Sequence, residues 1–287
     1  NVTLKSSTSS LDEVVVIGYG TQRKATLTGS VADVKGDVLE AAPTASLTNS
    51  LTGRLTGVTA LNRSGEPGDD VSAITIRGLS TLGNNDALVV IDGVAGRTDL
   101  NQINPRDIAS ISVLKDASAA IYGARAANGV ILITTKRGKI GKPSINVTFN
   151  RGIYKPTFVT ERANSQQIAT FQNLRAADLG NPLPWTADEL TKLGDGSDPI
   201  RYPNTNWTDE IFKNSSTQSK AGLSIGGGSD AVKYFLSSNF SEVGSIFKDG
   251  INQSKKVGVL SNIDVAVNDN LSVSVDMSYS NQDVTYP

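Results

Sequence analysis

The sequence predicts an α+β domain followed by the first strands of a large antiparallel transmembrane β-barrel. The N-terminal half contains short strand-like and helix-like segments, whereas the C-terminal half contains long runs in which apolar and polar residues alternate. Alternation with a period of two places one kind of side chain on each face of a strand. The connections between the long runs are alternately short and long, as are the periplasmic turns and extracellular loops of outer-membrane barrels.

Composition narrows the class of function. The 287 residues carry 27 Lys and Arg against 28 Asp and Glu, so a net charge of -1 gives no steering toward nucleic acid. Histidine and cysteine are both absent, which excludes a Cys or His zinc site, a thiol nucleophile and a Ser-His-Asp triad within this sequence. No carboxylate pair stands out as a general acid and base, so we expect no enzyme activity and no cofactor. The Asp-rich loops at residues 69–70 and 195–198 offer oxygen ligands that suit calcium, but neither has an EF-hand pattern, so we expect solvated loops without metal. The sequence contains no run of about 20 apolar residues, so no transmembrane helix is expected.

The first strand-like run covers residues 11–20. Residues 14–17 have high β propensity and follow the acidic pair Asp12 and Glu13. The run is either an exposed strand that adds to the sheet of a partner or an ordinary buried strand, and the residues alone favour the buried strand. A dinucleotide fingerprint is excluded, because its third glycine would fall at position 23, which is Arg23.

A compact α+β unit is predicted over residues 25–141. A helix is expected at residues 46–55, where three leucines recur at four-residue spacing, with Gly57 at its end. Loops rich in Gly and Asn are expected at residues 62–70 and 78–86. The strands of the unit are expected, in order, at residues 30–34, 58–61, 74–77, 88–91, 111–114 and 130–135.

The unit is organised around residues 104–138. Between its last two strands, a small-residue helix is expected at residues 118–122, capped by the side chain of Asp116 or Ser118. Gly123 and Gly129 stand where the chain must turn sharply.

The last strand of the unit is apolar almost throughout, so it should be buried on both faces. Lys136, Arg137 and Lys139 are expected to end it in solvent. Charged residues at other strand ends are expected to form ion pairs that hold the domain together or fasten it to the barrel; they are Arg77, Asp92, Lys115 and Asp116.

In the C-terminal half, the expected short connections are residues 226–230 and 268–270, and the long ones are 156–216 and 242–255. A soluble β-sandwich alternates in the same way and is the alternative, although it gives no reason for this parity. Within the first long connection, residues 164–179 have a helical pattern and Thr186 begins a capping box. The alternating runs are residues 145–150, 221–226, 232–240, 257–268 and 271–280.

Several of these segments resemble one family. DIASISVLKDASAAIYGARAANGVILITTKRG, at residues 107–138, resembles the end of the plug domain of SusC-like TonB-dependent outer-membrane transporters (SusC/RagA). ITIRGL at residues 74–79 and LVVIDG at residues 88–93 resemble earlier plug strands. LDEVVVIGYG at residues 11–20 is similar to a Ton box, and NTNWTDEIF at residues 204–212 is similar to a segment after the first barrel strand.

The resemblance implies a domain order. Residues 1–10 would be the tail of an N-terminal extension and a linker, residues 11–24 the Ton box and its linker, and residues 25–141 the plug. Residues 142–287 would be the first strands and loops of the barrel. The family closes its barrel with about 22 strands, and five strands would leave open edges in a bilayer, so we expect the N-terminal part of a longer protein.

The resemblance also implies a function. It is the TonB-dependent import of a large nutrient, an oligosaccharide or a peptide, across the outer membrane of a Gram-negative, Bacteroidota-type bacterium. The implied partners are TonB, a SusD-like surface lipoprotein, the substrate and outer-membrane lipid, with a dimer of transporter–lipoprotein pairs as the assembly. The alternatives are a siderophore or vitamin receptor, a surface adhesin and, weakest, a soluble nucleotide-dependent enzyme.

Site residues follow from the same resemblance. The predicted TonB-binding residues are Asp12, Glu13, Val14, Val15, Val16, Ile17 and Gly18. The predicted structural or locking residues of the plug are Arg77, Gly78, Asp92, Gly93, Lys115, Asp116, Tyr122, Gly123 and Gly129. The predicted substrate contacts are Arg63, Glu66, Leu82, Asn84 and Asn85.

Overall fold

The computed structural model describes residues 14–17, 20–23, 31–42, 44, 46–79, 83–96, 100–157, 160–248 and 252–286. The chain forms two units. The first contains Asn1–Arg151, Ser219–Val243 and Gln253–Thr285, and the second contains Gly152–Gln218, Gly244–Asn252 and Tyr286–Pro287. The first unit therefore holds the α+β domain together with most of the long strands.

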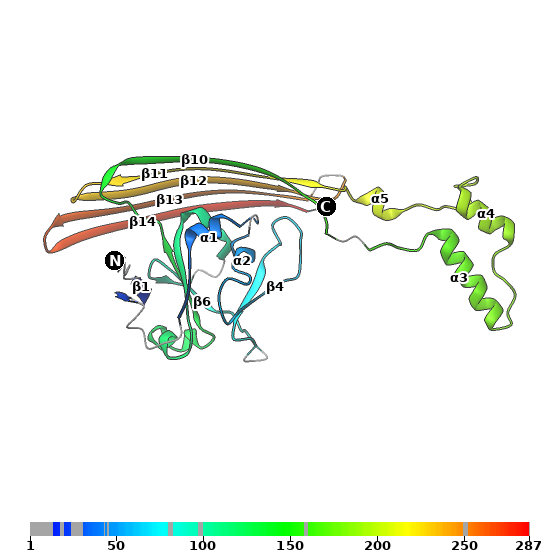
Figure 1. Ribbon diagram of the computed structural model, residues 1–287, viewed down its shortest axis with the longest axis horizontal. Coiled ribbons are helices and arrows are strands. Elements are labelled where there is room, and N and C mark those ends of the chain that lie inside the picture. The colour runs from blue at the N-terminus through cyan, green and yellow to red at the C-terminus, as the bar shows by residue number, and fades with distance from the viewer. Residues whose placement is uncertain are drawn as a thin grey trace, which may run out of the picture. The chain divides into compact units, whose positions relative to one another are not determined.

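A mixed five-stranded sheet forms the centre of the α+β domain (Figure 1). In the sheet, β6 and β9 are parallel, whereas β8 runs antiparallel to β3 and β9, and β7 antiparallel to β6. The strand order is β3 (Val31–Lys35), β8 (Ile108–Leu114), β9 (Val130–Thr135), β6 (Leu88–Ile91) and β7 (Val94–Ala95).

The sheet is buried on both faces, as predicted for β9, whose first four residues are at most 4% exposed. One face packs against α1 (Gly36–Glu40), α2 (Leu47–Ser50) and the hairpin of β4 (Val58–Asn62) and β5 (Ser72–Ile76). The other face packs against the 3-10 segments η4 (Asp116–Tyr122) and η5 (Ala124–Ala126). Two shorter 3-10 turns, η2 (Leu100–Gln102) and η3 (Pro105–Asp107), precede β8.

The helix predicted at residues 46–55 is correct in its buried face but too long. Leu47, Leu51 and Leu55 are 1%, 1% and 4% exposed, yet α2 ends at Ser50. Turns follow α2, and Gly53 and Gly57 both have a φ of 72°, a left-handed conformation that regular helix does not contain.

Of the two predicted caps for the segment before Gly123, Ser118 does not form one, because its hydroxyl has no hydrogen-bond partner among the residues that the structure describes. The side chain of Asp116, the other predicted cap, lies outside the described residues. Residues 116–122 form a 3-10 helix, its N-cap position is Lys115, and it has no side-chain cap hydrogen bond. The ammonium of Lys115 instead donates to the carbonyl oxygen of Thr56. Gly123 and Gly129 have φ values of 72° and 88°, which confirms the sharp turns. The left-handed conformation of Gly129 favours glycine, and a Cβ there would also lie 3.2 Å from the carbonyl oxygen of Leu114.

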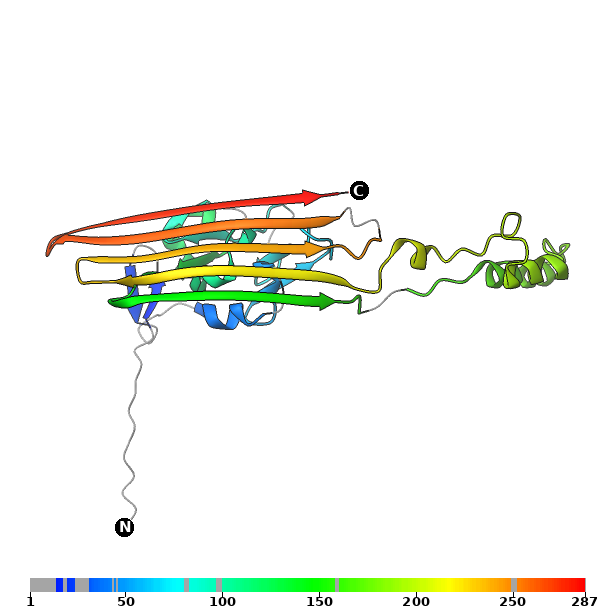
Figure 2. The ribbon, with the colours of Figure 1, turned by 90° about the horizontal axis from the view of Figure 1, so that it is seen from above.

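Five long strands form a second sheet, in the order in which they occur in the chain. Figure 2 shows their arrowheads pointing in alternate directions. The strands are β10 (Gly141–Tyr154), β11 (Ser216–Gly228), β12 (Val232–Gly244), β13 (Gln253–Asn268) and β14 (Leu271–Thr285). Residues 229–231 and 269–270 are the short connections, and residues 155–215 and 245–252 are the long ones, so the predicted parity is confirmed.

On β12 and β13, most of the side chains buried against the α+β domain are polar, with Phe235 and Leu260 as apolar exceptions, whereas large apolar side chains are exposed. On β12, Ser237 and Asn239 are 5% and 6% exposed, whereas Leu236 and Phe240 are 42% and 38% exposed. The buried side chains contact the α+β domain, as the bond between Asn239 and Asp107 shows. A soluble sandwich buries its apolar face, so this inversion excludes that alternative and gives the pattern of a strand that faces lipid.

The second unit contains the helices of the first long connection. Both predicted helix starts are confirmed, because α3 (Ser165–Asp178) and α4 (Ala187–Asp195) each begin with a complete capping box. A short helix, α5 (Trp207–Ile211), follows them. Within the described ranges, no helix is both long and apolar enough to cross a membrane.

The orientation of the long sheet predicts opposite outcomes at two adjacent positions in the middle of β14. Met277 is 57% exposed on the apolar face, and Ser278, the next residue along β14, lies on the opposite, polar face of the strand. We expect Met277→Arg to destabilise the folded receptor by about 2–4 kcal/mol, because it puts a charge into lipid. Ser278→Arg should cost much less; equal costs in a urea titration in bilayers would contradict the orientation.

Candidate functional site

One edge of the mixed sheet is polar and contacts the long sheet. Because β6 and β9 are parallel and β8 is antiparallel to β9, the ends of β6 and β9 meet the start of β8 at this edge. We call this group of residues the wall-facing edge; it consists of Asp92, Asp107, Thr135, Lys136 and Arg137.

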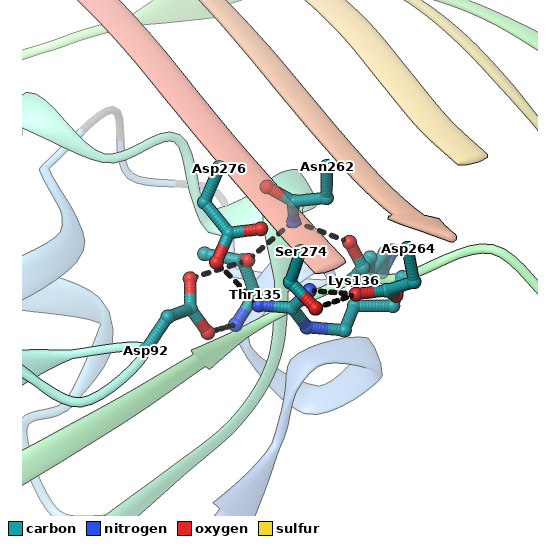
Figure 3. A network of polar contacts seen from close by, with 8 residues as sticks. Asp92, Thr135, Lys136, Asn262, Asp264, Ser274 and Asp276 are labelled. Atoms are coloured by element: carbon teal, nitrogen blue, oxygen red, sulfur yellow. Dashed lines mark hydrogen bonds and ion pairs between the residues drawn. The ribbon is translucent and has the colours of Figure 1, made fainter. Parts of the chain in front are cut away.

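Arg137 binds two strands of the long sheet at once, through Asp264 and Asp276, which are labelled in Figure 3. Its Nη1 lies 2.8 Å from Oδ1 of Asp264 on β13, and its Nη2 lies 2.6 Å from Oδ2 of Asp276 on β14. The hydroxyl of Ser274 also donates to Oδ1 of Asp264, at 2.7 Å. Burial lowers the pKa of Arg137, but the hydrogen bond and charge of Asp276 and the charge of Asp264 more than offset this, so the pKa is raised.

Asn262 on β13 makes the second contact. Its Nδ2 donates to Oγ1 of Thr135 at 2.7 Å and to the carbonyl oxygen of Lys136 at 2.9 Å. The same Thr135 hydroxyl donates to Oδ2 of Asp92 at 2.6 Å, while the backbone N–H of Thr135 donates to Oδ1 at 3.0 Å. Asn262 is 1% exposed, so a single buried amide links the turn after β6 and the end of β9 to the long sheet (Figure 3).

Asp107 makes the third contact, with β12. Its Oδ2 accepts a hydrogen bond of 2.9 Å from Nδ2 of Asn239, and its side chain is nearly fully buried. Burial raises the pKa of Asp107, and the hydrogen bond from Asn239 and the charges of Lys136 and Arg106 oppose this only in part.

Arg106 makes the fourth contact, with β10. Its Nη1 donates to Oγ1 of Thr148 at 2.6 Å. The carboxylate of Glu40, at the end of α1, lies 3.7 Å from Nε of Arg106 and 3.6 Å from Nζ of Lys136. The α+β domain is therefore fastened to β10, β12, β13 and β14 by polar side chains.

The expectation that Lys136 and Arg137 end β9 in solvent is wrong; both are half-buried, and only Lys139 is exposed. Sequence reasoning missed Arg137 together with its partners Asp264 and Asp276. A signal was present, because both aspartates lie on the polar faces of alternating runs, and these faces turn toward the plug if the apolar faces meet lipid. Which basic residue would reach them could not be read from the sequence.

The predicted locking residues do not lie together. Arg77 and Gly78, with φ of 61° and 89°, and Asp92 and Gly93, with φ of 46° and 85°, are left-handed pairs at the ends of β5 and β6. Lys115 is 5% exposed at the opposite end of β8 from Asp107.

Tyr122 packs against the core cluster on the second face of the sheet. The side chain of Asp116 lies outside the described part of the chain. Asp92 is the one predicted locking residue among the five residues that define the wall-facing edge.

The predicted substrate contacts are not brought together. Arg63 and Glu66 are exposed in the loop that joins β4 to β5, whereas Asn84 and Asn85 follow the other end of β5. Leu82 lies outside the described residues. Their role in substrate binding stays a prediction, and the topology makes them two separate candidate surfaces.

The predicted Ton box is described in part. Val14, Val15, Val16 and Ile17 form β1 (Val14–Ile17), which pairs antiparallel with β2 (Gly20–Arg23) from Val14 opposite Arg23 to Ile17 opposite Gly20. The remaining predicted TonB-binding residues, Asp12, Glu13 and Gly18, lie outside the described residues. The extended conformation suits strand addition, and TonB binding stays a prediction.

Comparison with known proteins places this arrangement in a family. The TonB-dependent Receptor Plug Domain matches residues 23–130. The chain is 38% identical over 281 residues to TonB-dependent receptor P26 of Formosa agariphila, covering 95% of this chain and 27% of that protein. It is 38% identical over 259 residues to TonB-dependent receptor SusC of Bacteroides thetaiotaomicron, covering 86% and 24% respectively.

Solved structures of TonB-dependent receptors also match the fold of this chain. The RagAB peptide importer in its open-open state matches with a TM-score of 0.80 at 27% identity, covering 95% of this chain and 32% of that one. The siderophore receptor PirA of Acinetobacter baumannii matches with a TM-score of 0.57 at 19% identity, which shows the fold alone.

The α+β domain is therefore the plug domain of a TonB-dependent receptor, and the long sheet corresponds to strands of its barrel. Within that class, the chain belongs to the SusC-like receptors. It spans about a quarter of the length of the curated relatives, 27% of P26 and 24% of SusC. Receptors of this family are outer-membrane proteins of Bacteroidota, which confirms the predicted location.

The two ion pairs that Arg137 forms with Asp264 and Asp276, called here the fork of Arg137, should stabilise the attachment of the plug to the long sheet, so removing them should weaken it. Arg137→Met keeps the aliphatic stem and removes both ion pairs, which are partly exposed, so we expect a loss of about 1–2 kcal/mol, between the values for exposed and buried pairs. Lys139→Met removes an exposed charge two residues away and should change stability by less than about 0.5 kcal/mol. Urea-dependent proteolysis of the plug in the full receptor measures both, and equal effects would exclude the fork as an anchor.

Asp107 should make plug docking dependent on pH. Its docked carboxyl has a pKa above the usual 3.8, so the docked plug binds this proton more tightly than a released plug. The contribution of Asp107 to docking therefore falls as the pH rises from the usual value through the raised one.

Asp107→Asn keeps an acceptor for Asn239 and removes the titration. The pH dependence of plug release should become flatter in the acid range, and docking at neutral pH should be at least as strong. The measurement is the urea midpoint of plug release between about pH 4 and pH 8. An unchanged pH profile would contradict the role of Asp107.

Proposed function

We propose that this chain is the plug-bearing part of an energy-coupled importer that brings an oligosaccharide or a peptide across the outer membrane. The observation that carries the proposal is the wall-facing edge, which fastens the plug to a sheet that is polar inside and apolar outside. A plug held in this way closes a lipid-embedded barrel and still has a contact surface that can be opened.

The polar character of the contact matters for the mechanism. A hydrogen bond contributes only about 0.5–1.5 kcal/mol net, because water replaces the lost partner when the bond opens. The four contacts at Asp107, Arg106, Asn262 and Arg137 can therefore be exchanged for water as the plug moves. Apolar packing of similar extent would leave a cavity with no replacement partner.

The work for this movement would enter through β1. An extended segment adds to the sheet of a partner through main-chain hydrogen bonds, and the proposed partner is TonB. The chain runs from β1 and β2 to β3, which is a terminal strand in the order of the plug sheet and pairs with β8. A pull on β1 would therefore reach the plug at β3, an edge of its sheet.

A SusD-like surface lipoprotein is the proposed second partner, with a dimer of transporter–lipoprotein pairs as the assembly. Two relationships support this: 38% identity to SusC, and a fold match to RagAB, a peptide importer, at 27% identity. A siderophore receptor shares the fold at 19% identity, which gives no support for iron transport by this chain.

The Ton-box assignment predicts a loss of transport without a loss of binding. Deleting residues 12–17 should abolish uptake, because nothing then couples the plug to TonB, while binding of substrate at the cell surface is retained. Val15→Pro should act in the same way, since proline removes a backbone donor, and Val15→Thr should transport normally. Uptake is followed with a labelled substrate. A deletion variant that takes up substrate at the wild-type rate would contradict the Ton-box assignment.

A further inference from the structure

The four contacts described above fasten the plug to β10, β12, β13 and β14 and leave out β11, which lies between β10 and β12 in the long sheet. Two residues of β11 nevertheless face the plug. The ammonium of Lys220 donates to the carbonyl oxygen of Thr44, in the segment between α1 and α2. Gly222 lies two residues further along β11 and therefore on the same face of the strand.

Three polar side chains converge over Gly222. A Cβ at this position would lie 2.9 Å from Oδ1 of Asn239, 3.0 Å from Nη1 of Arg106 and 3.0 Å from Oγ1 of Thr148. Non-bonded atoms pack best at larger separations, about 3.5–4.0 Å for two carbons. Since Arg106 belongs to the plug and the other two residues belong to β12 and β10, Gly222 is the floor on which a plug residue meets the wall.

The same side chains make two of the bonds between plug and wall. Nη1 of Arg106 donates to Oγ1 of Thr148 at 2.6 Å, and the Thr148 hydroxyl donates to the carbonyl oxygen of Gly222 at 3.4 Å. The amide of Asn239 donates to Asp107 at 2.9 Å. These side chains could move away from an added methyl group, but each movement would lengthen one of these bonds. The space left beside them, about 20 Å³, holds about one water molecule.

The local backbone gives no other reason for a glycine at this position. Gly222 is not one of the glycines with a positive φ. Glycine also weakens the interior of a strand, because it loses the most backbone entropy and has no side chain to pack. A close approach by another part of the protein is a common reason for such a glycine, and the side chain of Arg106 makes that approach here.

We propose that β11 is the docking strand for the plug segments next to β3. Gly222 is the positioning residue that seats Arg106 on the wall, and Lys220 is a hook on the segment after α1. Helix α1 follows β3 directly, and Glu40 at its end lies 3.7 Å from Nε of Arg106. The proposal rests on the proposed function in one respect, because the pull through β3 is what would open this seat.

The test measures plug release by urea-dependent proteolysis in the full-length receptor, which needs neither TonB nor substrate. Gly222→Ala should lower the urea midpoint by about 0.5–1 M, because it weakens two hydrogen bonds. Gly258→Ala is the matched control. Gly258 lies on the same face of β13 as Asn262, but a Cβ there would lie 3.8 Å from the carbonyl oxygen of Tyr279, an ordinary contact. Its midpoint should stay the same or rise slightly.

A positioning role has a signature that a general loss of barrel stability lacks. If Gly222→Ala moves Asn239 away from Asp107, plug release should lose its pH dependence in the acid range, as in Asp107→Asn. The losses in Gly222→Ala and Arg106→Met should also not add in the double variant, because both act on one contact.

The hook has its own test, which also applies if Gly222→Ala fails to assemble. Lys220→Met keeps the stem and removes the ammonium, so it should lower the urea midpoint. Lys255→Met, on the opposite face of β13 from Asn262, is its control and should leave the midpoint unchanged. Equal midpoints for Lys220→Met and Lys255→Met would exclude the hook.

The seat would be excluded by equal midpoints for Gly222→Ala and Gly258→Ala, by additive losses in the double variant, or by a wild-type pH profile in Gly222→Ala. Uptake in the Ton-box deletion separates this proposal from the function on which it rests. If that deletion abolishes uptake while Gly222→Ala releases the plug as the wild type does, the importer stands and the seat does not.

Discussion

The fork of Arg137 between Asp264 and Asp276 is the contact on which the rest of the structure depends. The two carboxylates come from neighbouring strands of the long sheet, so one guanidinium fixes both strands and the end of β9. This is possible only because the long sheet turns its polar face inward. That inversion in turn requires an environment in which apolar side chains are stable outside, which a bilayer provides and water does not.

A polar contact also reconciles two demands on a plug. It must close the barrel, and it must be able to move while a substrate passes. The plug core meets the first demand through apolar side chains on both faces of its sheet, where Ile108, Ile111, Val113 and Val130 are fully buried. The wall-facing edge meets the second demand, because its hydrogen bonds and ion pairs can be replaced by water. The rigid and the exchangeable parts are thus chemically distinct.

Much of the fold follows from local sequence pattern. Period-two alternation and the parity of the connections predict the long strands, and the apolar run at residues 130–135 predicts a doubly buried strand. The length of α2 does not follow from the leucine spacing, which overestimates it, because the spacing continues through Gly53, and Gly53 takes a left-handed conformation that regular helix does not contain. The environment of Arg137 does not follow either. Its partners lie more than a hundred residues away, and a basic residue after a buried strand has the same local pattern whether it meets solvent or two aspartates.

The most direct test of the account is a disulfide between the plug and the long sheet. Residues 1–287 contain no cysteine, and Nδ2 of Asn262 lies 2.7 Å from Oγ1 of Thr135, so a cysteine pair introduced at these two positions, in a receptor with no other free thiol, reports on this contact. The account predicts that the cross-link forms in outer membranes and stops uptake until a reductant is added. Failure to form the cross-link, or full uptake with the cross-link intact, would contradict a plug that is fastened at this edge and must be released from it.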